Sequence, residues 1–427
     1  MKVLLISQGS TGDIYPLIAL GRALLDAGHT VSFATAPLYR AEIEGAGLAF
    51  LHTPPDWEKP VFVECMRELD RQSNPILLLR QIYRSGLSFM GELIDRVEAY
   101  VQTHDLVVCS YVFPHFKLLC DRHNVPFATI TFCHSVIPAK DITPELFPSL
   151  RGLPQPIQNQ WNQLCWWLVN FAVDHAVNSI SRATFISRGL PPVKDFIRAP
   201  AELSIVSVSK QLMGLSQHMD PRFQFTGYLR WQSKESEVLQ HELELFCEGE
   251  AVPVLTFGSV SFDHVQDIMS RFAHRWPKGK KIIIQSGWAG LSVELSRPEI
   301  KIIHSVSHDQ LFKFASCVIH HGGAGTTASV LHAGVPHVVV PHFGDQDFWA
   351  SEVKRLGVGV SLPQKKWPEL LPKAVARVTQ KKKYSLRAKA LAEILAKEPG
   401  AANAVQALAD YVQQCAPMVG RELGSSI

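Results

Sequence analysis

The chain has 427 residues, which is long for one domain and suits two domains that each bury a full core. Hydrophobic residues make up 46% of it and charged residues 19%, as in a globular protein, so extended disorder is excluded. The 42 basic and 39 acidic residues nearly cancel, and the charge therefore gives no support to nucleic-acid binding.

Eight cysteines are scattered along the chain without a CxxC pair, and several lie in apolar runs. This pattern predicts buried free thiols in a reducing compartment, with neither a zinc site nor a disulfide framework. Met1 and Lys2 lead directly into an apolar strand without a signal peptide, and the polar residues that follow exclude a spanning helix there. We therefore expect a cytoplasmic protein.

The first half alternates strand and helix patterns, which is typical of a doubly wound α/β sheet. A strand over residues 3–7, a helix over 14–27 that Gly28 ends, and a strand over 30–36 form the first βαβ unit. Together with the strands that follow, they predict a Rossmann-like domain over residues 1–228. These further strands are predicted over residues 49–52, 106–111, 127–132, 203–209 and 223–227.

The turn after the first strand has the sequence Gln-Gly-Ser-Thr-Gly-Asp-Ile-Tyr-Pro over residues 8–16. It lacks the GxGxxG pattern of dinucleotide-binding folds, and the second strand ends in Ala34-Thr35-Ala36 where an acidic residue would hold a ribose. A nicotinamide or flavin cofactor is therefore not expected. Asp13 lies at the start of the first helix, where a plain helix cap is as reasonable as a functional carboxylate.

Two features of the first domain are candidates for ligand contacts. His134 follows a predicted strand and so lies at the same sheet edge as Asp13, as a ligand contact or as a satisfied loop histidine. The apolar stretch over residues 164–177 includes Trp166, which could line an apolar pocket or belong to the core. Its polar residues favour a buried or interfacial helix over a transmembrane one, and peripheral contact with a membrane is left open.

A polar linker and a helix over residues 229–250 precede a second alternating series. This series predicts a second Rossmann-like domain over residues 251–398, and a final helix follows over 399–415. The strands of the second domain are predicted over residues 253–257, 281–285, 301–306, 316–320, 337–340 and 358–362.

The densest motif is Ile-His-His-Gly-Gly-Ala-Gly-Thr-Thr over residues 319–327, which joins a strand to a helix. A helix that starts here leaves the amides of Ala324, Gly325 and Thr326 without intrahelical partners. With the positive end of the helix dipole these amides form a site for phosphate. Alone, a glycine turn before a helix is as often a plain connection.

The next strand delivers a polar pair, Asp345 and Gln346, to the same edge of the sheet. Ligands of open α/β sheets bind at this edge, outside the carboxyl ends of the strands. Phosphate donors beside a pair suited to hydroxyl groups indicate a ligand in which a sugar is joined to a diphosphate.

Residues 307–362 resemble the donor-binding module of family 1 glycosyltransferases. A His-Asp-x-Leu-Phe segment, the His-His-Gly-Gly-Ala-Gly-Thr-Thr turn and a Phe-Gly-Asp-Gln-x-Phe-Trp loop follow at the spacings of its sterol glucosyltransferase branch. The length of the sequence and its Gly-Ser-x-Gly-Asp start also suit the branch of rhamnosyltransferases that act on hydroxy-fatty-acid lipids. The resemblance implies a GT-B fold, in which two Rossmann-like domains face a cleft and the final helix crosses back to the N-terminal domain. It also implies that the donor binds the C-terminal domain and the acceptor the N-terminal one.

The resemblance assigns roles to residues of both domains. Asp13 is the catalytic base, and His321 donates to the diphosphate and helps the nucleotide leave. Ser305 and Ser329 depart from the plant members, which have a tryptophan for the base and a glutamate for the ribose at these positions. The donor-binding residues are Gly258, Ser259, Val306, His308, His321, Gly323, Ala324, Gly325, Thr326, Asp345 and Gln346, and the candidate acceptor contacts are Gly12, Asp13, His134 and Trp166.

Asp345-Gln346-Asp347 has the form of the manganese-binding DxD motif of another glycosyltransferase fold. In this module we interpret it as two sugar contacts and a bystander. Helix amides and His321 carry the phosphate charge here, so no metal and no cofactor are expected.

The leading hypothesis is an inverting transferase that moves a hexose, glucose from UDP-glucose, to a hydroxyl of an apolar acceptor such as a sterol, terpenoid, polyketide or hydroxylated lipid. The nearest alternative is a dTDP-rhamnose-dependent rhamnosyltransferase that acts on a hydroxy-fatty-acid lipid. A nucleotide-sugar epimerase on the same fold is a second alternative. A non-catalytic binder of nucleotide sugars or lipids is disfavoured because Asp13, His321 and the Asp345-Gln346 pair are all present.

Overall fold

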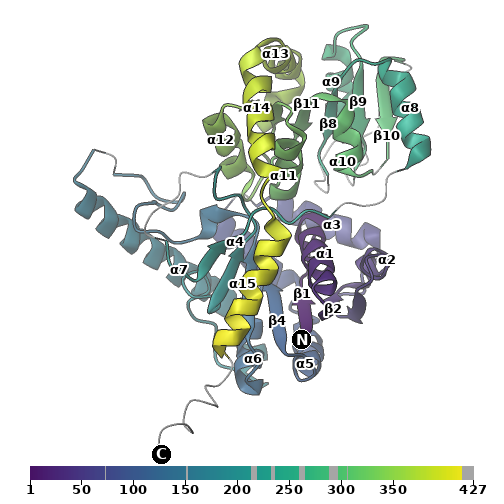
Figure 1. Cartoon of the computed structure of the whole chain (residues 1–427). Coiled ribbons are helices and arrows are strands. Elements are labelled where there is room, and N and C mark those ends of the chain that lie inside the picture. Colours follow the sequence, from purple (N-terminus) through teal and green to yellow (C-terminus); the bar gives the residue numbers. More distant parts are fainter. Residues whose placement is uncertain are drawn as a thin grey trace, which may run out of the picture.

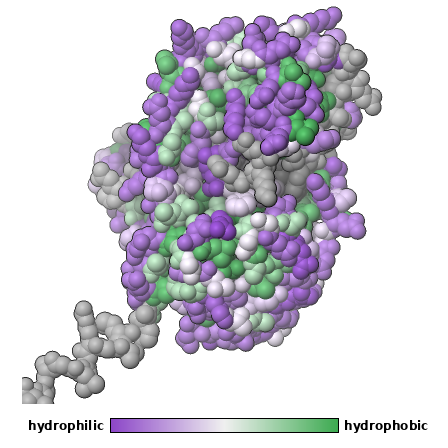
Figure 2. All heavy atoms as spheres, turned by 45° about the vertical axis from the view of Figure 1, so that its right-hand side comes forward, coloured by the Kyte–Doolittle hydropathy of each residue, from purple (hydrophilic) through white to green (hydrophobic). Residues whose placement is uncertain are grey.

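The computed structural model describes residues 1–72, 74–150, 152–212, 219–231, 236–258, 265–287, 297–304 and 306–415. In this part of the chain each half folds around its own parallel β-sheet with helices on both faces, and the two units stack one above the other (Figure 1). In Figure 2 hydrophilic side chains cover most of the visible upper unit, and apolar ones are interspersed over the lower, N-terminal unit. This architecture confirms the predicted α/β class with two Rossmann-like domains.

The N-terminal sheet has seven parallel strands in the order β3-β2-β1-β4-β5-β6-β7. Its central strands β1, β4 and β5 are almost entirely buried, as expected for a sheet covered on both faces. The strand order reverses between β1 and β4, so the carboxyl ends of these two strands border the crevice where ligands of such sheets bind. The strands are β1 (Lys2–Ile6), β2 (Thr30–Thr35), β3 (Ala49–His52), β4 (Leu106–Ser110), β5 (Phe127–Thr131), β6 (Leu203–Val206) and β7 (Phe223–Phe225).

The longest helix of the N-terminal domain is α7, with 32 residues, and part of it extends away from the body of the molecule (Figure 1). It begins before the predicted apolar stretch because Pro156 suits the first turn of a helix. No helix within the described ranges is long and apolar enough to cross a membrane. The helices are α1 (Thr11–Asp26), α2 (Arg40–Gly45), α3 (Lys59–Asp70), α4 (Pro75–Ser85), α5 (Met90–Val101), α6 (Lys117–His123) and α7 (Gln155–Ile186), with the short turns η1 (Pro37–Tyr39), η2 (Pro114–Phe116) and η3 (His134–Val136).

The C-terminal sheet has six parallel strands in the order β10-β9-β8-β11-β12-β13, and the order reverses between β8 and β11. Its core includes the fully buried Trp367, which packs against Phe257 and Phe272. The strands are β8 (Val252–Thr256), β9 (Ile282–Gln285), β10 (Ile300–Ile303), β11 (Ala315–His320), β12 (His337–Val339) and β13 (Gly359–Ser361). The helices are α8 (Glu237–Cys247), α9 (Val265–Arg275), α10 (His308–Leu311), α11 (Ala324–Ala333), α12 (Gln346–Leu356), α13 (Trp367–Gln380) and α14 (Lys382–Leu395), with η4 (Phe312–Phe314) and η5 (Gln364–Lys366).

The last helix, α15 (Gly400–Cys415), crosses back to the N-terminal domain, as predicted (Figure 1). Ala404 and Leu408 are fully buried in the core of that domain, and the Tyr411 hydroxyl donates to the Phe127 carbonyl at 3.2 Å. The chain passes between the domains twice, after β7 and before α15, and these two segments are in contact. A Cβ atom at Gly400 would lie 2.4 Å from the Tyr228 carbonyl oxygen.

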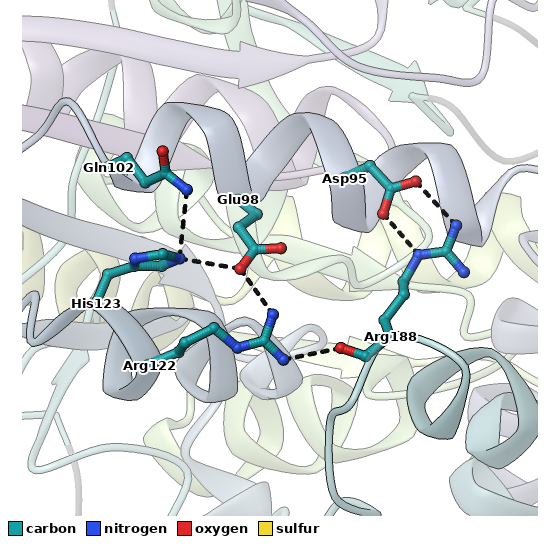
Figure 3. A network of polar contacts seen from close by, with 6 residues as sticks. All are labelled: Asp95, Glu98, Gln102, Arg122, His123 and Arg188. Carbon is teal, nitrogen blue, oxygen red and sulfur yellow. Dashed lines mark hydrogen bonds and ion pairs between the residues drawn. The ribbon is translucent and has the colours of Figure 1, made fainter.

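A polar network on the outer surface ties α5 to α6 and to the segment after α7 (Figure 3). Glu98 accepts from Arg122 at 2.8 Å and contacts the His123 ring at 2.9 Å, while Asp95 accepts two hydrogen bonds from Arg188. The Arg122 guanidinium also donates to the Arg188 carbonyl at 2.9 Å. Burial alone would raise the pKa of Glu98, but the hydrogen bonds from His123 and Arg122 outweigh it, and the pKa is lowered.

Candidate active site

The glycine turn of the C-terminal domain joins β11 to α11 as the motif predicts. Gly322 has φ +94°, and a Cβ atom there would lie 2.8 Å from a methyl carbon of Val339, so this position needs glycine. The helix cap is Gly323, and the first turn of α11 has neither a capping side chain nor an acidic residue. Thr327 is the first residue of α11 whose amide donates backwards, to the Gly323 carbonyl at 2.9 Å. The three amides before it are left for an external anion.

A buried histidine pair supports this turn from below. The Gly322 amide donates to His320 Nδ1 at 3.1 Å, and His320 Nε2 lies 3.0 Å from His337 Nδ1. His320 therefore supports the backbone of the turn, whereas His321 lies beside the turn. A Cβ atom at Gly323 would lie 2.3 Å from His321 Nε2, and one at Gly258 would lie 3.3 Å from His321 Cε1.

His321 is neutral in this environment. Burial lowers its pKa to about 3, and the nearby His342 and His308 act in the same direction. Its Nδ1 atom is buried without a hydrogen-bond partner among the described residues. A neutral imidazole has one N–H donor, and close to the α11 amides that donor can serve a phosphate oxygen.

The loop after β12 holds the predicted sugar contacts. Asp345 occupies the N-cap position of α12 without a capping hydrogen bond from its side chain, and its Oδ2 accepts from the Trp349 indole at 3.0 Å. Gln346 is buried, and its Oε1 accepts from the His342 amide at 2.8 Å. Gln346 thus supports its own loop, a role that the sequence did not suggest, and only its amide nitrogen is left to meet a ligand.

The remaining donor candidates lie around the end of β8. Gly258 follows β8 at φ +58°, whereas Ser259 and Ser305 lie outside the described residues. The Val306 carbonyl accepts from Gln285 at 2.9 Å, which ties this segment to the end of β9. His308 stacks on Phe312 with the ring centroids 4.8 Å apart, and burial lowers its pKa to about 4.

In the N-terminal domain, Asp13 occupies the third position of α1 and is not the helix cap. The cap is Ser10, and Asp13 Oδ2 reaches back to accept from the Ser10 amide at 2.8 Å and from the Ser10 hydroxyl at 3.1 Å. Gly9 makes room for this carboxylate, because a Cβ atom there would lie 2.4 Å from Oδ2. Gly12 lies exposed at the start of the same helix.

Electrostatics link Asp13 to Asp345, in the loop after β12 of the other domain. Burial raises the pKa of Asp13, and the hydrogen bonds from Ser10 only partly offset it. Burial also raises the pKa of Asp345 to about 6, against the hydrogen bond from Trp349, and the charge of Asp13 adds to this rise. The two carboxylates therefore lie near one another, although they belong to different domains and are far apart in sequence.

The other two acceptor candidates have packing roles in this structure. His134 starts η3 after β5, and its ring contacts Phe348 and Trp349 with centroid distances of 4.5 and 5.8 Å. It is thus part of the contact between the domains, and burial lowers its pKa to about 3. Trp166 is 5% exposed, and its indole donates to the Ile142 carbonyl at 2.8 Å.

Two residues near Asp13 were not singled out from the sequence. Ser10 could have been found, because a serine three residues before an acidic residue is the capping-box spacing. Tyr111 follows β4 at the crevice, and burial raises its pKa, with the charges of Asp345 and Asp13 acting in the same direction. No motif marks this tyrosine, because only the strand order brings it beside the first turn.

Within the described ranges, no three His, Cys, Asp or Glu side chains gather in a way that could hold a metal ion. Asp345 is engaged by Trp349, and Asp347 is exposed in the first turn of α12.

Two domain families match this chain. Residues 3–88 match the glycosyltransferase family 28 N-terminal domain. Residues 282–411 match the erythromycin biosynthesis protein CIII-like C-terminal domain. The first match includes the turn with Asp13, and the second includes the glycine turn and the donor loop.

Similar proteins span most of the chain. O-mycaminosyltylonolide 6-deoxyallosyltransferase of Streptomyces fradiae is 26% identical over 97% of this chain and 98% of its own length. Vancomycin aglycone glucosyltransferase of Amycolatopsis orientalis is 27% identical over 84% of this chain and 86% of its own length. A sterol 3-beta-glucosyltransferase of Debaryomyces hansenii is 24% identical over 95% of this chain, which corresponds to 26% of that longer protein.

Solved structures share the two-domain fold. The glycotransferase of kitacinnamycin superposes with a TM-score of 0.68 at 18% identity, over 96% of this chain and 98% of the other. The glycosyltransferase SsfS6 of Streptomyces sp. SF2575, complexed with thymidine diphosphate, superposes with a TM-score of 0.64 at 20% identity, over 96% and 99% of the two chains. The two domain matches and this shared fold support a family 1 glycosyltransferase of the GT-B fold.

Proposed function

We propose that this chain is an inverting glycosyltransferase that moves glucose from UDP-glucose to a hydroxyl group of an apolar acceptor. The observation that carries the proposal is that α1 and α11, two helices with unlike first turns, are in contact although they belong to different domains. The start of α11 offers amides without an internal acid, and the start of α1 presents the carboxylate of Asp13. The amides of α11 suit the binding of a diphosphate, and the carboxylate of α1 suits the acceptance of a proton.

The donor side is built to hold negative charge. The amides of Ala324, Gly325 and Thr326 would hold the diphosphate at the positive end of α11, and the N–H group of His321 would donate to a phosphate oxygen. These donors would also stabilise the charge that develops on the leaving nucleotide. Asp345 and the free amide nitrogen of Gln346 would bind hydroxyl groups of the sugar.

The reaction is a single displacement at the anomeric carbon. The acceptor oxygen forms a bond to this carbon while the bond from the carbon to the diphosphate oxygen breaks, and the electron pair of that bond leaves with the nucleoside diphosphate. Asp13 takes the proton of the acceptor hydroxyl as the new bond forms. Burial raises the pKa of Asp13 and so makes the carboxylate a stronger base than an exposed aspartate.

The donor sugar is the finer part of the proposal. Two relatives are named glucosyltransferases, which supports glucose, and the Asp345-Gln346 pair suits a sugar with several hydroxyl groups. A dTDP-linked 6-deoxyhexose, including dTDP-rhamnose, is the second candidate. It is favoured by the thymidine diphosphate bound in SsfS6 and by the 6-deoxyallosyltransferase relative.

For the acceptor we propose a hydroxylated apolar compound of the polyketide or sterol type. The support comes from relatives named for O-mycaminosyltylonolide and for a sterol. Since the N-terminal domain carries Asp13, the acceptor would bind on that side of the cleft.

A panel of nucleotide sugars and acceptors, read out by mass spectrometry, tests the proposal. We expect a product heavier than the acceptor by one hexose with UDP-glucose, and the same rate in excess EDTA, because helix amides and His321 carry the phosphate charge. Turnover with dTDP-rhamnose alone would select the second candidate. Loss of turnover in EDTA that manganese restores would assign the Asp345-Gln346-Asp347 segment to a metal. Conversion of the nucleotide sugar without an acceptor would instead indicate an epimerase.

A further inference from the structure

The first turn of α1 contains a residue that the proposed reaction does not yet use. Ser10 donates twice to the same oxygen of Asp13, from its amide at 2.8 Å and from its hydroxyl at 3.1 Å. The other oxygen, Oδ1, accepts no hydrogen bond from the residues that the structure describes, and it is not among the buried unpaired atoms. The two oxygens of this carboxylate are therefore in different situations.

The surroundings of the turn hold this arrangement in place. The missing side chain of Gly9 leaves the space that Oδ2 occupies, because a Cβ atom there would lie 2.4 Å away. The Tyr39 hydroxyl donates to the Gly9 carbonyl at 3.1 Å and so fixes the backbone beside the carboxylate. A carboxylate with one oxygen held from several sides has little freedom to rotate, and its second oxygen keeps one direction.

We propose that Ser10 is a positioning residue, which holds Oδ2 of Asp13 so that Oδ1 faces the cleft as the proton acceptor. This inference rests on the proposed function, in which Asp13 is the base. Ser10 acts through Asp13, since its hydroxyl donates to that carboxylate.

The same contacts set the charge state of Asp13. Hydrogen bonds to a carboxylate favour its ionised form, whereas burial favours the protonated form. For Asp13 burial is the larger effect, and Ser10 limits the rise in pKa that it causes. The other titratable groups that interact with Asp13 are Tyr39, Tyr111 and Asp345. None of them donates a hydrogen bond to Asp13 within the described ranges, so the serine hydroxyl is the contact to remove.

The experiment is the pH profile of kcat/KM for the full chain and three variants, with a donor and acceptor that the panel identifies. Ser10→Ala removes the hydroxyl but keeps the amide, and Ser10→Thr keeps both. With Ser10→Ala, we expect the acidic limb of the profile to shift to higher pH by on the order of 1 unit. At pH values above this limb, kcat/KM should stay within a few-fold of wild type. The threonine variant should restore the wild-type limb. Ser236→Ala, which removes the hydroxyl of another helix cap, should leave the limb in place.

Each outcome separates this inference from the function on which it rests. An unmoved limb in Ser10→Ala would overturn the role of Ser10 while leaving the glycosyltransferase intact. A loss that is equal at every pH and accompanied by a lower melting temperature would show that the serine only stabilises α1. If Asp13→Asn keeps nearly all of the activity, Asp13 is not the base, and the inference about Ser10 falls with it.

Discussion

The starts of α1 and α11 are built alike and used differently. Each follows a parallel strand at the crevice of its sheet, and each is preceded by a glycine at positive φ, Gly9 at +131° and Gly322 at +94°. In α1 the third residue is Asp13, whose carboxylate returns to the cap, whereas in α11 the third residue is Thr326 and the first turn holds no acid. A carboxylate in the first turn of a helix hydrogen-bonds the free amides itself. A first turn without a carboxylate leaves these amides available for a phosphate ligand.

The largest effect is expected from replacing Asp13, the proposed base, in α1. Asp13→Asn keeps an oxygen that can accept from the Ser10 amide, so α1 should still form, but it removes the proton acceptor. Transfer should fall by about 10²- to 10⁴-fold, with the affinity for UDP unchanged, as measured by steady-state kinetics and calorimetry. Activity within a few-fold of wild type would take Asp13 out of the mechanism.

The second test makes α11 resemble α1. Thr326→Asp places a carboxylate at the position that Asp13 holds in α1, and it should repel the diphosphate from the same amides. We expect UDP affinity to fall by about 100-fold in calorimetry. Thr326→Asn is the matched control, since it has the same shape without the charge and should bind UDP within a few-fold of wild type. Equal losses in both variants would mean that packing, and not charge, decides binding at this helix.

A smaller effect is expected at the sugar. Gln346→Ala removes the amide that would meet a sugar hydroxyl, and an unpaired buried group costs about 1 to 3 kcal/mol, so transfer should fall by about 10-fold or more. The affinity for UDP should change less, because in the proposed complex the start of α11 holds the diphosphate. Gln346→Glu keeps the oxygen that accepts from the His342 amide and thus shows how much of the loss comes from the loop. If UDP binding and transfer fall by the same factor, Gln346 only supports its loop.

The smallest effect on activity is expected far from both helix starts, in the network of Figure 3. Glu98→Gln should leave transfer unchanged and lower the free energy of unfolding by about 1 kcal/mol at pH 7. Because the pKa of Glu98 is lower in the folded protein, its contribution is present above the unfolded pKa and is lost as the pH falls through the folded pKa. Urea unfolding of the wild type and of Glu98→Gln at pH 7 and at about pH 3 measures this contribution. A difference in the free energy of unfolding that persists at the lower pH would contradict the prediction.

The two helix starts also differ in how far the sequence predicted them. The glycine turn was singled out because its glycines, histidines and threonines are contiguous. Gly322 and Gly323 have local reasons, because a Cβ atom would lie 2.8 Å from Val339 at the first and 2.3 Å from His321 at the second. Asp13 was singled out through the resemblance to the family, and its catalytic role stays a prediction. The plain alternative, a helix cap, was wrong because Ser10 is the cap. The second role of Gln346 was not predicted, since its partner is a backbone amide placed by the fold of the loop.

Contacts between domains were the least predictable part. The sequence left His134 open between a ligand contact and a loop histidine. No local pattern marks its packing on Phe348 and Trp349, which lie over two hundred residues away in sequence. The strand order brings Tyr111 to the crevice, and no local pattern carries that information. For α7 the core of the helix was predicted, but its length was not, because the polar first turns carry no apolar periodicity.

The contact between the two segments that join the domains determines how the domains can move. Thr226 and Gly227 belong to the segment that leaves the N-terminal domain, and they lie beside Gly400 in the segment that returns to it. The Asn403 amide, also in the returning segment, donates to the Thr226 carbonyl at 2.9 Å. Two covalent connections that run side by side favour a hinge rotation of one domain relative to the other. They permit rotation about one line and resist sliding and twisting. A rotation about this contact would change the separation of Asp345 and Asp13, because the two residues belong to different domains.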